Sequence, residues 1–184
     1  MAPRLHHALW GWLNMITLPK KIHLTAMKKH WKVSYVQSSG KLIIIEHPHR
    51  ELVLYGKNYS KRAALHLLIR WVKLKSHDYL SELLNQLNRK VKVNYKKLIV
   101  RSQEAQWGSY SSSKTISLNY QLIFLPPTLV KYTIFHELCH VRCLDHSEKF
   151  WRELKKFDRH WKKNRKALVD ADNYIPVWVR GAKF

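Results

Sequence analysis

The sequence predicts an α+β fold with a small mixed or antiparallel sheet, an N-terminal β-meander and a central helix that carries the most reactive side chains. Short β-rich runs separated by turn signals fill residues 31–55, and a leucine-rich stripe of helical period covers 60–91. A second apolar stripe of helical spacing follows Pro126 and Pro127. With 184 residues and 46% hydrophobic content, the chain can bury an ordinary core.

The N-terminal part divides into an extension over residues 1–28 and a β-meander over 29–56, which we expect to pack on the domain that follows. Its β-rich runs lie at 31–36, 42–46 and 52–54, separated by Ser38-Ser39-Gly40 and by His47-Pro48-His49. The two histidines of the second turn have no partner at metal-ligand spacing, so we interpret them as loop residues.

The domain that contains the central helix is predicted over residues 57–172, followed by a C-terminal tail over 173–184. Its first part is helical from 60 to 91, with a break at 76–78. Half-buried strands are expected at 96–102 and 115–123.

The segment Trp107-Gly108-Ser109 lies between these two strands. Gly108 suits a backbone that needs a positive φ or a close approach to another group. A sheet edge in this region could hold an extended peptide by strand addition. The candidate substrate-binding residues are Arg101, Trp107 and Asn119, and for Trp107 a role in packing alone is the alternative.

The central helix carries His136-Glu137-Leu138-Cys139-His140 and is expected to continue to about Leu144. Residues four apart share one helix face, so the imidazoles of His136 and His140 can reach a single Zn²⁺, while the apolar stripe lies on another face. Glu137 can overhang the metal without ligating it, which is where a general base for a metal-activated water must sit. This pattern predicts a zinc hydrolase.

A catalytic zinc site usually has three protein ligands and leaves one position for water. The helical period fades after Leu144 and Ser147 can cap a new helix, so the chain is expected to turn back near His146. His146 is the favoured third ligand, with Glu153 and His160 as alternatives. One zinc per chain is expected, although imidazole also suits Fe, Co, Ni and Cu.

Several motifs extend this pattern in order and spacing. They are Val100-Arg101-Ser102, Trp107-Gly108-Ser109, Ile116-Ser117-Leu118-Asn119, Leu125-Pro126-Pro127, the HExxH segment itself, His146-Ser147 and Phe150-Trp151. Together they resemble the YgjP-like metallopeptidase family and, more distantly, the SprT and WLM zinc proteases, which act near DNA. Gln106 and Tyr110 depart from the family pattern.

The resemblance implies a zincin-like metallopeptidase domain that hydrolyses peptide bonds of a peptide or protein substrate, with Glu137 catalytic and zinc on His136, His140 and His146. An electrophilic group that stabilises the oxyanion is usual in such chemistry. The sequence leaves five candidates for it: Arg101, Tyr110, Tyr132, Arg142 and His160.

The chain is a basic protein, with a net charge of +22 from 34 Lys+Arg against 12 Asp+Glu. This excess favours a polyanionic partner such as nucleic acid. The densest basic run follows Ser147, and its candidate nucleic-acid-binding residues are Lys155, Lys156, Lys162 and Lys163. Two other functions stay open: a nucleic-acid- or ribosome-binding module with a non-catalytic zinc, and a zinc hydrolase of non-peptide amides.

Cysteine usage and hydropathy bear on the compartment. The cysteines, Cys139 and Cys143, lie on the motif helix, where an intact turn disfavours a disulfide, so a reducing cytoplasm is expected. The apolar run at residues 8–18 lacks the small-residue cleavage site of a signal peptide. No stretch is long enough to span a membrane, so a membrane partner is not expected.

Overall fold

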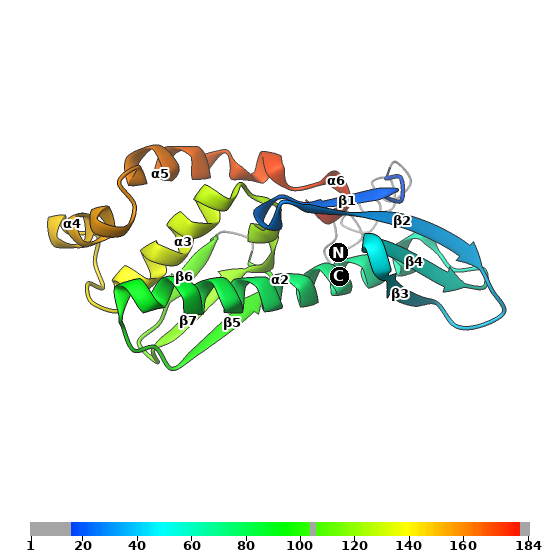
Figure 1. Ribbon diagram of the computed structural model, residues 1–184, viewed down its shortest axis with the longest axis horizontal. Helices are drawn as coiled ribbons and strands as arrows, with labels where there is room; N and C mark the ends of the chain where they lie inside the picture. The colour runs from blue at the N-terminus through cyan, green and yellow to red at the C-terminus, as the bar shows by residue number, and fades with distance from the viewer. Residues whose placement is uncertain (1–15, 104–105, 181–184) are drawn as a thin grey trace, which may run out of the picture. The chain divides into compact units, whose positions relative to one another are not determined.

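The computed structural model describes residues 16–103 and 106–180 and has the predicted α+β composition (Figure 1). The chain forms two compact units. Within the described residues, one unit comprises 16–23, 28–71 and 175–180, and the other comprises 24–27, 72–103 and 106–174. The long helix α2 (Lys61–Val91) contributes residues to both.

The first unit is built on a sheet whose strands are β1 (Lys21–Leu24), β2 (Lys29–Gln37), β3 (Ile43–His47) and β4 (Glu51–Gly56). The last strands are joined by a 3-10 turn, η2 (Pro48–Arg50), and the unit ends in the short helix α6 (Val177–Arg180). Trp31 and Trp71 meet edge to face at 5.2 Å, and both indoles donate hydrogen bonds to the carboxylate of Glu46.

The predicted meander strands are present, but their connectivity is not that of a meander. The strand order is β1-β2-β4-β3, in which β4 pairs in parallel with β2 and antiparallel with β3. Burial fits the place of β3, because β2 and β4 carry buried side chains whereas Ile43 and Ile45 of β3 are 48% and 39% exposed. The more exposed strand therefore forms the edge of the sheet.

The second unit contains a mixed sheet with the order β5-β7-β6. Its strands are β5 (Lys97–Arg101), β6 (Gly108–Tyr110) and β7 (Thr115–Asn119), with β5 parallel and β6 antiparallel to β7. The central strand β7 is buried along its whole length, and helix α3 (Pro127–His140) packs against β6 and β7 (Figure 1). The remaining elements are η1 (Thr25–Met27), η3 (Tyr120–Phe124), α4 (Glu148–Phe157), α5 (Trp161–Val169) and η4 (Ala171–Tyr174).

Helix α2 is continuous, so the break predicted at residues 76–78 is wrong. Ser76 is fully buried, and its hydroxyl donates a 2.8 Å hydrogen bond to the carbonyl of Tyr120. A serine inside a helix is tolerated when its hydroxyl is satisfied, and His77 and Asp78 beside it are exposed. The polar triplet is therefore part of the helix and not a turn.

Two other predicted boundaries are corrected. The strand expected to reach Ile123 ends at Asn119, whose side chain accepts a hydrogen bond from the backbone N–H of Gln121 and so starts η3. Helix α3 ends at His140 and does not continue to Leu144. The strand β6 was not predicted, because three residues are too few to show an alternating pattern.

In the part of the chain that the structure describes, no helix is both long and apolar enough to cross a membrane. Most of the apolar run at residues 8–18 lies outside the described residues. The predicted domain limits at residues 28, 56 and 172 stay a prediction.

Candidate active site

Helix α3 positions the first two histidines. Pro127 occupies the first turn of the helix, where its missing N–H costs nothing. His136 and His140 are one helical turn apart, and His140 is the last residue of the helix. Both imidazoles therefore project from the same face. The apolar residues Val130, Ile134 and Leu138 are fully buried on the opposite side. The prediction that the apolar stripe and the two histidines lie on different faces of this helix is thus confirmed.

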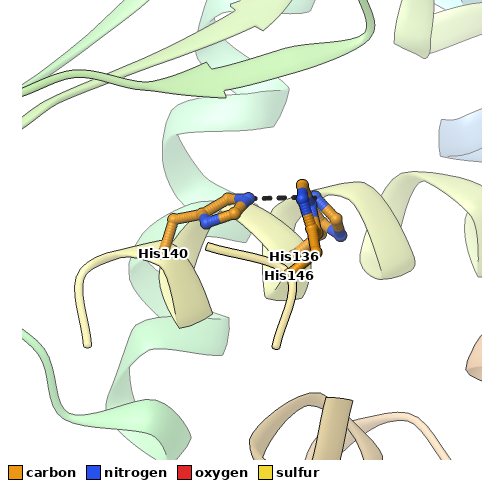
Figure 2. Close-up of side chains that lie close together, drawn as sticks. All are labelled: His136, His140 and His146. Carbon is orange, nitrogen blue, oxygen red and sulfur yellow. Dashed lines mark hydrogen bonds between the residues drawn. The ribbon is translucent and has the colours of Figure 1, made fainter. Parts of the chain in front are cut away.

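His146 joins the pair from beyond the helix (Figure 2). Its Nε2 lies 3.0 Å from Nε2 of His136, and Nε2 of His140 lies 3.1 Å from the same atom. Candidate ligand atoms of the three residues all fall within 4.8 Å of one another. The chain turns back after α3, as the sequence predicted, and brings all three imidazoles to one point.

The cluster fits a tetrahedral metal ion. Three nitrogens bound to zinc at about 2.0 to 2.1 Å would lie roughly 3.3 Å apart, close to the two shortest separations found here. Facing ring nitrogens without a cation cannot all be satisfied by hydrogen bonds among themselves, whereas a cation accepts a lone pair from each. The Nδ1 of His140 lies 3.0 Å from the carbonyl of Cys143, which is the outer hydrogen bond usual for a histidine ligand.

Burial favours the metal-binding form of these histidines. The pKa of His136 is lowered to about 3, mainly by burial and then by the neighbouring His140 and His146. Burial also lowers the pKa of His140, which is only 9% exposed. Both rings are therefore neutral near pH 7, and the neutral imidazole is the form that ligates a metal.

Glu137 is a buried carboxylate with an open oxygen. It is only 4% exposed, and burial raises its pKa to about 8. Among the described residues, its Oε2 has no hydrogen-bond partner. A positive charge at the histidine cluster would favour the carboxylate form. The side chain thus combines burial with a free acceptor, as a proton-accepting group requires.

Gly108 of β6 packs directly against Glu137. A Cβ atom built on Gly108 would lie 2.7 Å from Oε1 of Glu137 and 2.8 Å from its Cγ, distances that real Cβ contacts do not reach. Gly108 has no positive φ, so of the two reasons proposed for this glycine the close approach is the correct one. Only a residue without a side chain lets β6 lie this near the carboxylate.

The histidines and Glu137 line a cleft of about 390 Å³ between β6 and α3. Gln106, Trp107 and Leu168 belong to this cleft and also to a second, polar hollow of about 350 Å³. The other lining residues of the first cleft are Gly108, Ser109, Tyr110, Tyr132, Thr133 and Leu144. Of the five oxyanion candidates, Tyr110 and Tyr132 reach the cleft, and Arg101, Arg142 and His160 are not among its lining residues.

The remaining candidates are placed elsewhere. Arg101 is exposed at the end of β5. Asn119 is buried and lines the second hollow, where its amide donates hydrogen bonds to the carbonyls of Gln103 and Gln106. His160 is exposed at the start of α5. Asn119 therefore shapes the loop before β6 and does not reach the histidines.

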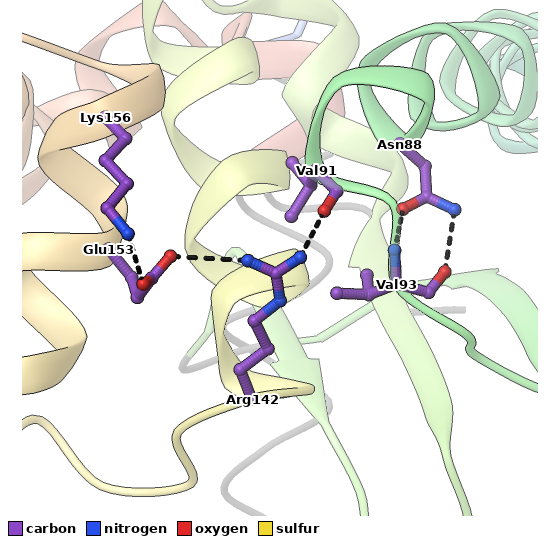
Figure 3. A network of polar contacts seen from close by, with 6 residues as sticks. All are labelled: Asn88, Val91, Val93, Arg142, Glu153 and Lys156. Atoms are coloured by element: carbon purple, nitrogen blue, oxygen red, sulfur yellow. Dashed lines mark hydrogen bonds and ion pairs between the residues drawn. The ribbon is translucent and has the colours of Figure 1, made fainter.

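Glu153, an alternative third ligand, is occupied by a polar network (Figure 3). Its carboxylate pairs with Arg142 at 3.3 Å and with Lys156. Arg142 also donates a 2.6 Å hydrogen bond to the carbonyl of Val91, which ends α2. Arg142 precedes His146 in the chain, and Glu153 follows it in α4. The network therefore holds the loop that carries His146 in place at both of its ends.

Phe150 contributes to the site in a way that the sequence did not reveal. Its ring is fully buried and lies 4.6 to 4.8 Å, between centroids, from all three histidine rings. The sequence placed it on the packing side of a helix, which is correct. Its position under the histidine cluster depends on the path of the chain at residues 141–147. The sequence predicts that the chain turns back there but does not predict the path that it takes.

The family model for the YgjP-like metallopeptidase domain matches residues 15–171 of the chain. The chain belongs to the YgjP-like metallopeptidase family. It is a zinc metallopeptidase, that is, a hydrolase of the HExxH type, as the motif predicted.

Two solved structures are also similar to this YgjP-like chain. The metallopeptidase zymogen of Pyrococcus abyssi abylysin has 22% sequence identity and a TM-score of 0.45, covering 50% of this chain and 92% of that chain. The metallopeptidase zymogen of Methanocaldococcus jannaschii jannalysin has 20% identity and a TM-score of 0.45, covering 50% of this chain and 94% of that chain. Comparison with curated proteins gives no match.

The contact between Gly108 and Glu137 gives a testable prediction for this peptidase. Gly108→Ala should displace the carboxylate and lower kcat on fluorescein-labelled casein by about 100-fold, since small misplacements of a reacting group cost about this much. Zinc content should be unchanged. Gly40→Ala is the matched control, because a Cβ there meets no atom within 4 Å. Equal activities of the two variants would contradict the positional role of Gly108.

Proposed function

We propose that the chain hydrolyses peptide bonds with one zinc held by His136, His140 and His146 and with Glu137 as the general base. The convergence of three Nε2 atoms beside a buried carboxylate carries this proposal. Structural zinc sites are usually closed by four protein ligands, whereas three ligands facing an open cleft are typical of a catalytic site. This difference supports a peptidase over a binding module with a non-catalytic zinc.

The mechanism assigns each residue a separate task. When bound, zinc supplies Lewis-acid chemistry, which acidifies water and polarises a carbonyl. Glu137 accepts the proton of the attacking water at Oε2, the oxygen without a partner, and returns it to the leaving amine. Gly108 lies against the other side of the carboxylate, near Oε1, and leaves room for it. The burial of Glu137 helps the acceptance step, because a raised pKa makes the carboxylate a stronger base toward the water proton.

Peptide binding is assigned to the β6 side of the cleft. β6 is an edge strand of its sheet, so an extended substrate can add to it by backbone hydrogen bonds. Trp107 precedes this edge and lines the cleft. Tyr132 is our choice for the oxyanion donor, since burial raises its pKa to about 12 and keeps the phenol protonated. Tyr110, on β6 itself, is the second choice.

Replacing the general base separates chemistry from metal binding. Glu137→Gln should retain zinc and lose roughly 10²- to 10⁴-fold in kcat on labelled casein, the range usual for a general acid–base group. Metal content and casein hydrolysis are measured on the same preparation. Full activity in a zinc-loaded variant would refute the role of Glu137.

A zinc-loaded, active-site-intact protein that cleaves no member of a peptide library would favour the alternative substrate class, a non-peptide amide.

Cys139 and Cys143 are buried and free, which supports a proposed cytoplasmic location.

We further propose that a basic surface formed by α4 and α5 brings the peptidase close to nucleic acid. Lys155, Lys162 and Lys163 are exposed on these helices, whereas Lys156 is neutralised in part by Glu153. Helix α4 is amphipathic, with Phe150 and Leu154 buried, so its basic face is directed to solvent. The exposed lysines, together with the net charge of +22, support phosphate contacts without sequence preference.

The charge proposal predicts a change in salt dependence. Lys155→Gln, Lys162→Gln and Lys163→Gln combined should reduce the slope of log K against log salt for an RNA hairpin by about one per lost phosphate contact. A control variant with Lys29, Lys41 and Lys57 changed to Gln removes the same charge from exposed positions of the other unit. If both triple variants bind with the same slope, the surface on α4 and α5 is not the binding site.

A further inference from the structure

The ring of His146 is held differently from the ring of His140. His140 has an outer hydrogen bond from Nδ1 to a backbone carbonyl, which is the usual way to orient a histidine ligand. Among the described residues, the ring of His146 makes one hydrogen bond, between its Nε2 and Nε2 of His136, and its Nδ1 has no such outer partner. It is exposed and lies in a loop, so another interaction must fix its ring.

Trp151 supplies that interaction. Its indole stacks on the imidazole of His146 at 5.4 Å between centroids and 26° between planes. Trp161, the first residue of α5, stacks on Trp151 at 4.4 Å and 14°. The guanidinium of Arg165 lies 4.8 Å from the centroid of the Trp151 ring. Trp151 is therefore held by groups from α5 while it contacts the histidine.

The start of helix α4 explains the stack. Ser147 is the N-cap, so His146 is the residue before the cap and Trp151 is the fourth residue of the helix. Side chains at these two positions commonly pack on each other as a hydrophobic staple, which fixes the direction in which the chain enters a helix. The side chain of Ser147 makes no capping hydrogen bond to the first turn of α4, and its backbone N–H bonds to the Asp145 carboxylate at 3.4 Å.

We infer that Trp151 is a positioning residue for the metal: the helix-start contact between Trp151 and His146 sets the ring of His146 toward His136 and His140 before metal binds. The inference rests on the proposed function only in taking His146 as a ligand. A preorganised third ligand loses little conformational freedom when metal binds. The stack between Trp151 and His146 should therefore raise the affinity of the site for metal.

Three variants test the role of Trp151. Zinc affinity is measured by competition with a chromophoric chelator, and the geometry of the site by the visible spectrum of bound Co²⁺. Trp151→Ala should lower zinc affinity by roughly 10- to 100-fold, as loss of other outer partners of metal ligands does, and should alter the Co²⁺ spectrum. Trp151→Phe keeps an aromatic face and should stay close to the parent in both measurements.

Leu84→Ala is the control for general destabilisation, because Leu84 is fully buried in α2, outside α4 and α5. It should lower Tm without changing zinc affinity. A double-mutant cycle adds a second control: in a His146→Ala background, Trp151→Ala should cause no further loss of affinity, since the tryptophan acts through the histidine.

Parental zinc affinity and a parental Co²⁺ spectrum in Trp151→Ala would overturn the inference. An equal loss in Leu84→Ala would also overturn it, because the effect would then be one of stability. These outcomes are distinct from failure of the proposed function, in which the parent itself binds no zinc and the inference falls with it.

Discussion

The convergence of three imidazoles at one point is the constraint on which the catalytic unit depends. Helix geometry supplies two of them without cost, because His136 and His140 lie one turn apart on α3. The third has to come from chain that has reversed direction. The end of α3 at His140, the turn at residues 141–147 and the start of α4 all serve this reversal. Burial of His136 and His140 then keeps these rings in the ligating form.

The loop between α3 and α4 is short, and it is fixed at several points. Arg142 connects the loop to the end of α2 and to Glu153 of α4. His140 bonds to the Cys143 carbonyl, and Ser147 bonds to Asp145. Phe150 fills the space beneath all three rings. Polar contacts thus fix the path of the loop, and aromatic contacts fix the orientation of the three histidine rings.

The small sheet positions the carboxylate of Glu137, as α4 positions the ring of His146. β6 lies close to Glu137 only because Gly108 has no side chain. The carboxylate is left with an open oxygen in a buried place, an arrangement that costs stability and is typical of reactive groups. The sheet therefore orients the carboxylate of the proposed base, and the two helices orient the three histidines of the proposed metal site.

The motif helix and its buried stripe could be predicted from the sequence, because both follow from a single helical period. The strands at β2 to β5 were also found, since their alternation is local. The break at Ser76 was predicted wrongly because a distant carbonyl, that of Tyr120, satisfies this serine. The order of the first sheet, the contact of Gly108 with Glu137 and the position of Phe150 are likewise set by residues far apart in the chain, and no local pattern reports them.

The most direct test of the account is the metal content of protein purified without chelator or added metal, determined by elemental analysis for the parent, His146→Ala and Glu153→Ala. The account predicts about one zinc per chain in the parent and in Glu153→Ala, and much less in His146→Ala, since three ligands hold a catalytic zinc and the Glu153 carboxylate is occupied by Arg142 and Lys156. A parent without metal, or full zinc content in His146→Ala, would contradict the three-histidine site.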